Sequence, residues 1–151
     1  LYQIKHGATT IWERWDAIRA DGKMFDPAMN SYNHYAYGSV CQWLFEGLAG
    51  FRPDPDEPAF NHVIFEPLVV PALAPLKATH DSLAGRVEAG WQVDGDKVTY
   101  EIEIPEGAHG SLRLKACYSL ARIDGQAATA SAEPVVLSAG KHTIEFSMAG
   151  L

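Results

Sequence analysis

The residues best suited to chemistry lie within residues 7–38. There the carboxylate of Glu13 is flanked by the indoles of Trp12 and Trp15, and His34 follows among several tyrosines. Indole rings beside a carboxylate suit sugar recognition, because a pyranose offers an apolar C–H face for stacking and hydroxyls that need charged acceptors. A carboxylate in partly apolar surroundings also suits proton transfer. The stretch is therefore compatible with acid–base chemistry on a carbohydrate.

A structural interpretation of the same residues is equally open. The spacing of Thr10 and Glu13 matches a capping box, in which the threonine side chain accepts from the Glu13 N–H and the glutamate carboxylate accepts from the Thr10 N–H. His34 has a similar alternative, as a histidine near a helix start that makes only backbone contacts. The capping pattern is short and common, so spacing alone does not choose between the two interpretations.

Two longer runs carry more information than the spacing. KHGATTIWERWD occupies residues 5–16 and MNSYNHYAYG occupies residues 29–38. Both runs, in this order and at this separation, resemble the C-terminal part of the catalytic domain of bacterial α-L-rhamnosidases, which are classified as glycoside hydrolase family 78. The strand-rich tail that follows resembles the C-terminal domain of the same family, so the resemblance covers essentially the whole chain.

The resemblance implies an α+β chain, with the last helices and active-site loop of an (α/α)6 barrel followed by an antiparallel β-sandwich. It also implies inverting hydrolysis of terminal α-L-rhamnosides, in which one carboxylic acid protonates the leaving oxygen and a second carboxylate activates water. Matched on the motifs, Glu13 would be the general base and His34 would bind rhamnose hydroxyls. A rhamnose-containing glycoside is the implied partner.

One feature of the family is missing from these residues. Its general acid belongs to an acidic motif containing arginine and tryptophan, well upstream of the run that holds Glu13, and no such motif occurs here. The chain also begins with Leu1, inside an apparent helix. We therefore expect a C-terminal fragment that supplies the base and the sugar-binding histidine but is inactive alone.

Composition excludes several other classes of function. The formal net charge is −7, with twelve scattered cationic residues, so no basic face for nucleic acid is predicted. No window approaches the ~18 apolar residues that a membrane helix needs, and no export leader is recognisable, so the compartment is not predicted. The histidines and cysteines lack metal-ligand spacing, so neither a metal site nor a cofactor is expected. Cys41 and Cys117 are interpreted as buried apolar residues.

Residues 35–49 carry the clearest helical pattern, after a turn-rich stretch at residues 17–35 that predicts a long loop. One apolar stripe combines with a second row and leaves only a narrow polar face; the apolar positions are Tyr37, Val40, Cys41, Trp43, Leu44, Phe45, Gly47 and Leu48. Such a helix needs burial on most sides. In this chain alone we therefore expect the helix to find a substitute partner: the sandwich, the remaining helix or a second copy of the chain. The expected result is a homo-oligomer or a rearranged N-terminal segment.

Residues 50–58 contain three prolines and predict the boundary between a helical segment at 1–58 and a sandwich at 59–151. After them the pattern changes to short, turn-separated strands; the predicted ranges are 61–66, 76–81, 85–93, 97–104, 111–116, 121–124, 134–137 and 141–146. The pair Asp94-Gly95 predicts a type I′ hairpin turn. An alternative function is a non-catalytic β-sandwich module, either structural or carbohydrate-binding. Trp91 would be the residue that binds the sugar, although its parity with Val87 points it into the core.

Overall fold

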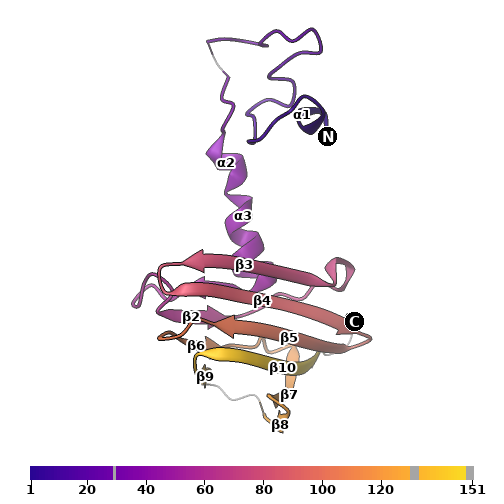
Figure 1. The fold of residues 1–151 in the computed structure, drawn as a ribbon. Coiled ribbons are helices and arrows are strands. Elements are labelled where there is room, and N and C mark those ends of the chain that lie inside the picture. The colour runs from indigo at the N-terminus through magenta and orange to yellow at the C-terminus, as the bar shows by residue number, and fades with distance from the viewer. Residues whose placement is uncertain (29, 130–132, 149–151) are drawn as a thin grey trace. The chain divides into compact units, whose positions relative to one another are not determined.

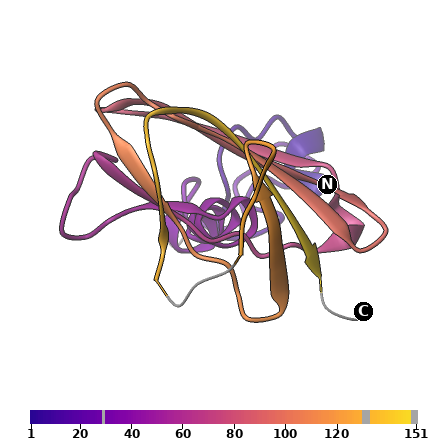
Figure 2. The same cartoon turned by 90° about the horizontal axis from the view of Figure 1, so that it is seen from below.

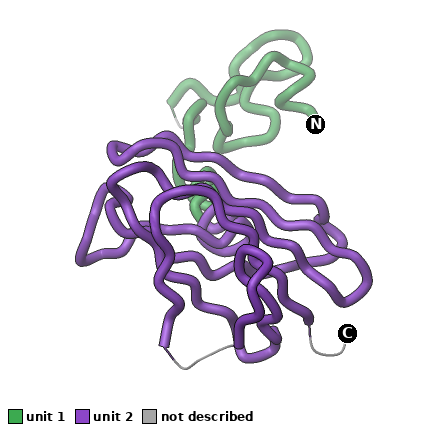
Figure 3. The backbone as a smooth tube through the Cα atoms, turned by 60° about the horizontal axis from the view of Figure 1, so that its bottom comes forward, with its two compact units in different colours: residues 1–42 green, residues 43–151 purple. Residues whose placement is uncertain are grey.

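The computed structural model describes residues 1–28, 30–129 and 133–148. It contains two compact units, residues 1–42 and residues 43–151 (Figure 3). Among the described residues, none of the helices combines the length and apolar character needed to span a membrane.

The first unit consists mainly of irregular chain. Helix α1 (Tyr2–Lys5) is followed by Gly7, whose φ of 77° is the left-handed conformation predicted for a helix end. The long predicted loop follows, and an isolated bridge pairs Ile18 with Met24. The Phe25 N–H donates to the carbonyl of Ala17 at 3.0 Å, and Ala17 is fully buried. The loop is thus held by its own backbone contacts.

The predicted helical range 35–49 is helical apart from one turn residue. It comprises α2 (Tyr35–Gly38), α3 (Val40–Trp43) and a π-helical turn η1 (Leu44–Ala49), and it ends at Gly50, which has left-handed dihedral angles. Much of its apolar surface is uncovered; the exposed residues include Tyr37, Val40, Cys41, Trp43, Leu44 and Phe45. The apolar face that the sequence predicts for this helix is therefore exposed in the structure, and the expected covering partner stays a prediction.

The second unit is the predicted β-sandwich (Figures 1 and 2). The smaller sheet has the order β1-β2-β6-β9; its strands are β1 (Phe51–Pro53), β2 (His62–Phe65), β6 (His109–Leu112) and β9 (Val135–Leu137). The larger sheet has the order β3-β4-β5-β10-β7-β8; its strands are β3 (Leu76–Ser82), β4 (Gly85–Asp94), β5 (Lys97–Ile104), β10 (Gly140–Met148), β7 (Tyr118–Ile123) and β8 (Gln126–Ala127). A short 3-10 turn, η2 (Pro71–Leu73), precedes β3.

Alternation along the strands builds the core between the two sheets. On β5 the residues Val98, Tyr100, Ile102 and Ile104 are all buried, as the period-two pattern predicts. They join residues of the smaller sheet in one apolar cluster, and the rings of Phe65 and Tyr100 meet edge to face at 6.4 Å. The prediction of a sandwich that follows a short helical segment is confirmed.

Two aromatic side chains of the larger sheet bind the end of the helix. Trp91 is 1% exposed, and its Nε1–H donates to the Leu48 carbonyl at 2.8 Å. Its cross-strand partner Tyr100 donates its hydroxyl to the carbonyls of Ala49 at 2.9 Å and Gly50 at 3.2 Å. Carbonyls at a helix end have no partner within the helix, so these two side chains supply what η1 cannot. Trp91 points into the core, as its parity predicted.

Several expectations are corrected by the structure. Cys41 and Cys117 are exposed, not buried, because Cys41 shares the uncovered helix face and Cys117 precedes β7 in a turn. Strand β1 has no counterpart among the predicted strands, and β2 pairs with β6 in parallel, whereas every other ladder is antiparallel among the described strands.

The hairpin turn between β4 and β5 also differs from the prediction. Asp94 pairs with Lys97, so the central turn residues are Gly95 and Asp96, and of these only Gly95 has a positive φ. Glycine at the first central position is typical of a type II′ turn. The register of the two strands, and not the Asp-Gly dipeptide, decides the turn type.

Candidate active site

The two candidate catalytic and binding residues lie on neighbouring segments of the first unit. The N–H of Glu13 donates to the Ser31 carbonyl at 2.8 Å, and the N–H of His34 donates to the Ile11 carbonyl at 2.8 Å. Residues 11–13 therefore run beside residues 31–34. The structure brings together the two motifs that the sequence places about twenty residues apart.

Glu13 is fixed by its own side chain as well as by its backbone. Its Oε2 accepts a hydrogen bond from the Ser31 N–H at 3.0 Å, and the residue is half-buried. A hydrogen bond from an amide to an ionised carboxylate is stronger than a neutral one, so it restricts the carboxylate's orientation. Part of the side chain stays accessible, which a residue that handles water or sugar requires.

The capping box is not formed. Thr10 donates its hydroxyl to the Tyr32 carbonyl, and Glu13 bonds to Ser31 instead of to Thr10. The chain after Thr10 is a series of bends and turns without an α-helix, so there are no helical N–H groups for it to cap. The helix-cap interpretation of Glu13 is therefore wrong, and the carboxylate instead links two loop segments.

The surrounding aromatic residues divide into a buried and an exposed group. Trp12 is 5% exposed and meets Tyr32 edge to face at 5.8 Å, so it belongs to the interior of the unit. Trp15 is 66% exposed and meets Tyr2 edge to face at 5.0 Å. Of the two indoles that flank Glu13, only Trp15 has substantial surface left for stacking.

His34 precedes helix α2 and is half-buried. Its ring lies 4.7 Å from that of Tyr37, at an interplanar angle of 52°, and both side chains belong to the second motif. Its backbone N–H is used by Ile11, whereas no hydrogen bond of its imidazole is found within the described residues. The ring is thus available for a ligand, as a sugar-binding role requires.

Two polar groups near these residues were not singled out by sequence reasoning. The buried Oδ1 atoms of Asp16 and Asn30 have no hydrogen-bond partner among the described residues, although Arg14 Nε lies 3.7 Å from Asp16 Oδ1. Buried acceptors normally have a hydrogen-bond partner, so two acceptors without one are notable in a candidate binding region. Both residues lie within the two motif runs, which is the only sequence signal that marks them.

Arg14 is positioned by an aromatic ring. Its guanidinium carbon lies 3.6 Å from the ring centroid of Phe25, a cation–π contact. This contact and the ion pair with Asp16 together restrict the orientation of the Arg14 side chain. The contact partner Phe25 lies in the long loop and could not be identified from the chain alone.

Comparison with known proteins places these residues in a family. Residues 1–48 match the family model described as the bacterial alpha-L-rhamnosidase six-hairpin glycosidase domain, and residues 50–118 match the bacterial alpha-L-rhamnosidase C-terminal domain. Both candidate residues fall within the first match.

Curated relatives agree with the family models. An alpha-L-rhamnosidase of Streptomyces avermitilis is 43% identical over 91 residues, which cover 60% of this chain and 9% of the relative. One from an Alteromonas species is 30% identical over 120 residues, covering 80% of this chain and 13% of the relative. One from Formosa agariphila is 32% identical over 116 residues, covering 76% and 12%. The chain therefore spans about a tenth of the length of the curated relatives it matches.

Solved structures show the same likeness in three dimensions. The crystal structure of the Streptomyces avermitilis alpha-L-rhamnosidase complexed with L-rhamnose matches with a TM-score of 0.69 and 30% identity, covering 95% of this chain and 14% of that one. The structure of the enzyme from Dictyoglumus thermophilum matches with a TM-score of 0.71 and 28% identity, covering 97% and 17%. The chain thus belongs to the bacterial α-L-rhamnosidase family, and it corresponds to parts of that family's six-hairpin glycosidase domain and C-terminal domain.

Proposed function

We propose that this chain is the C-terminal part of an inverting α-L-rhamnosidase that hydrolyses terminal α-L-rhamnosides. The observation that carries the proposal is the pairing of the two motifs, in which Glu13 and His34 lie on hydrogen-bonded neighbouring segments inside the region matched by the glycosidase family model. Within this proposal the end of the helical barrel lies within residues 1–58, and residues 59–151 form the sandwich together with β1 (Phe51–Pro53).

In the proposed reaction Glu13 acts as the general base. Its carboxylate takes a proton from water as the water oxygen attacks the anomeric carbon, while the glycosidic bond breaks and the leaving oxygen receives a proton from a carboxylic acid. That acid belongs to a part of the enzyme outside these residues. The hydrogen bond from Ser31 to Oε2 restricts the Glu13 carboxylate, so that one orientation toward water is favoured.

His34 is proposed to bind rhamnose hydroxyls. An imidazole has one donor and one acceptor nitrogen when neutral, so it can hold two neighbouring hydroxyls of a sugar. Trp15, being largely exposed, is the indole that could stack on the sugar's C–H face. The isolated chain would hold the base and these binding groups without the acid, and is therefore proposed to be inactive.

The test of the base is Glu13→Gln in the complete enzyme. We expect kcat for an aryl α-L-rhamnoside to fall by about 10²–10⁴, the usual range for loss of a general base. Added azide, which needs no deprotonation, should partly restore turnover and give the glycosyl azide of inverted configuration. The matched control is Asp21→Asn, an exposed carboxylate of the same unit, which should retain parent activity. Parent-like kcat in Glu13→Gln would refute the role.

The test of the histidine is His34→Ala, with the exposed His6→Ala as its control. If His34 binds the sugar, its loss should raise KM or lower kcat/KM for rhamnosides, and L-rhamnose should inhibit the variant more weakly. An unchanged inhibition constant for rhamnose would contradict the proposed contact.

The non-catalytic carbohydrate module loses its main support in the structure. Its one indole, Trp91, is buried and donates its N–H to the helix end, so its face is not available to a sugar. Titration of the isolated chain with polysaccharides would reveal such a module as saturable binding, which the enzymatic proposal does not expect.

A further inference from the structure

A cluster of metal-binding residue types lies in the smaller sheet, away from Glu13 in the chain. His62 and His109 are the first residues of β2 and β6, and they face each other in the parallel ladder. Their rings are stacked, with centroids 4.4 Å apart and an interplanar angle of 10°. Two imidazoles side by side on neighbouring strands form a preorganised pair of nitrogen donors.

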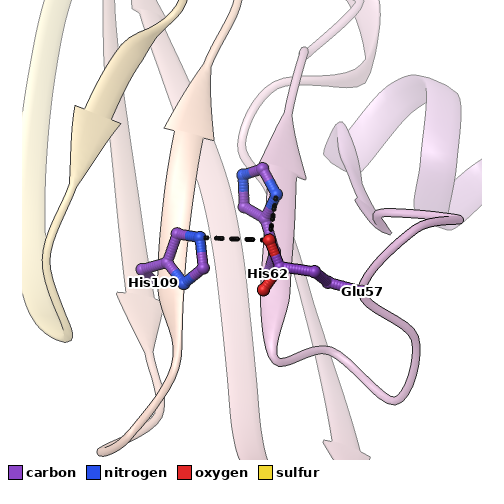
Figure 4. A group of neighbouring side chains, drawn as sticks. All are labelled: Glu57, His62 and His109. Carbon is purple, nitrogen blue, oxygen red and sulfur yellow. Dashed lines mark ion pairs between the residues drawn. The ribbon is translucent and has the colours of Figure 1, made fainter.

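Glu57 brings a carboxylate to both rings. Its Oε1 lies 3.9 Å from His62 Nδ1 and 3.8 Å from His109 Nε2, and Figure 4 shows it between the two side chains. The three potential ligand atoms all lie within 4.8 Å of one another. Both distances exceed those of a hydrogen bond. They are close to the spacing of about 3.3–3.5 Å between tetrahedral ligands whose bonds to zinc are about 2.0–2.2 Å long.

Asp54 adds a second carboxylate. Its Oδ2 lies 2.9 Å from His62 Nδ1, and its Oδ1 accepts from the Asp56 N–H at 2.9 Å, which fixes the side chain. The backbone N–H of Asp54 donates to the His62 carbonyl at 3.0 Å, so this end of the loop is attached to β2. Two oxygen donors therefore converge on the same edge of His62.

Ser111 contacts the opposite nitrogen of His62. Its Oγ lies 3.0 Å from His62 Nε2, and Ser111 is only 5% exposed. When Nε2–H donates to this hydroxyl, Nδ1 carries the lone pair that faces the carboxylates. At 2.9 Å the contact between Nδ1 and Asp54 Oδ2 is a hydrogen bond when Nδ1 carries the proton, and an ion that replaces this proton requires the tautomer in which Nε2–H donates to Ser111. Such an outer contact is typical of histidines that ligate metals, because it selects the tautomer.

We propose that Glu57, His62 and His109, with Asp54 as a fourth ligand, form a binding site for a divalent transition-metal ion of the zinc type. Imidazole nitrogens combined with carboxylates suit zinc and its first-row neighbours, whereas calcium and magnesium prefer all-oxygen sites. The role is structural. The ion joins the loop at residues 54–61 to β2 and β6, and it stabilises the sandwich because it binds the folded chain only.

The experiment titrates the untagged, chelator-treated chain with ZnCl₂ by isothermal calorimetry, and with CoCl₂ by visible absorption. We expect one Zn²⁺ per chain, a higher melting temperature with zinc, and cobalt bands of the intensity typical of four-coordination. Ca²⁺ and Mg²⁺ should not compete. Absence of saturable zinc binding, or equal affinity for Ca²⁺, would overturn the proposal.

Variants locate the ion. His109→Ala and Glu57→Gln should each weaken zinc binding by at least about tenfold, and Ser111→Ala by about 10–100-fold through the orientation of His62. Glu57 is 51% exposed, so Glu57→Gln keeps the shape of the loop and remains informative if a histidine variant does not fold. The matched control is His142→Ala, which removes a histidine paired with Asp124 elsewhere and should keep parent affinity. Zinc affinity that is unchanged in Glu57→Gln would refute the assignment.

Discussion

The hydrogen bonds from the Tyr100 hydroxyl to the helix end give the most direct test of how η1 is attached to the larger sheet. Tyr100 is fully buried, and its hydroxyl donates to the carbonyls of Ala49 and Gly50. Tyr100→Phe keeps the ring and removes only this donor. Gly50 retains a second hydrogen bond, from the Glu66 N–H at 2.7 Å, so Ala49 is the carbonyl mainly affected.

The expected loss of stability follows from these hydrogen bonds. A buried acceptor left without its donor costs about 1–3 kcal/mol, so Tyr100→Phe should lower the free energy of unfolding by roughly that amount. In a domain of about 100 residues each kcal/mol corresponds to roughly 4–8 °C in Tm. Urea unfolding followed by circular dichroism measures the change, provided that the m-value is the same in both proteins.

Alkaline pH supplies a second readout of the same group. Burial raises the pKa of Tyr100 well above its ordinary value of 10.0. The unfolded chain therefore ionises this phenol first, and the stabilisation present below pH 10 is lost as the pH rises further. Tyr100→Phe has no phenol at this position and does not lose this stabilisation. The difference in the free energy of unfolding between the parent and the variant should therefore become smaller above pH 10. Tyr118, whose pKa burial also raises, is present in both proteins and cancels in the difference.

The control is Thr79→Val, which deletes an exposed hydroxyl on β3 and should change stability by less than about 0.5 kcal/mol. A Tyr100→Phe variant with the urea midpoint of the parent, or with a deficit no larger than that of the control, would refute the idea that this hydroxyl holds the helix end.

Three further predictions concern the junction, acid stability and assembly. Gly50→Ala should lower the free energy of unfolding by more than ~2 kcal/mol, because left-handed backbone costs an L-residue about 1–2 kcal/mol and the new Cβ would lie 2.3 Å from a backbone carbon of the segment after β2. The control is Gly95→Ala, whose new Cβ would have no atom within 4 Å. In the same urea assay it should show only the cost of the left-handed backbone. The hydrogen bond from His142 is the largest cause that lowers the pKa of Asp124 below its ordinary 3.8. The stabilisation by the Asp124 carboxylate is therefore present above pH 3.8 and is lost as the pH falls through the pKa of the folded state. The stability advantage of the parent over Asp124→Asn should shrink in acid, and an advantage independent of pH would contradict this prediction. The exposed apolar helix should make the isolated chain self-associate in light scattering, and Trp43→Ser should reduce this, whereas a monomeric parent would contradict it.

Local patterns in the chain determined much of this protein. The alternation of Val98, Tyr100, Ile102 and Ile104 is sufficient to predict a half-buried strand, because side chains on a strand alternate between faces. The helix at residues 35–49 follows from its apolar period in the same way, and the three prolines within residues 50–58 predict that it cannot continue. The two motifs with Glu13 and His34 were also readable, because their residue types lie close together in sequence.

Tertiary structure decided whatever depends on which distant segments meet. The sequence predicted a strand at residues 111–116, but β6 begins at His109, and only its parallel register with β2 places that residue against His62. Burial of Trp91 was predicted, yet its hydrogen bond to the helix end required the sheets to be in place. The exposure of Cys41 likewise depends on what covers a helix. Periodicity reports the environment of one element, whereas register and docking are set by long-range contacts that no local pattern contains.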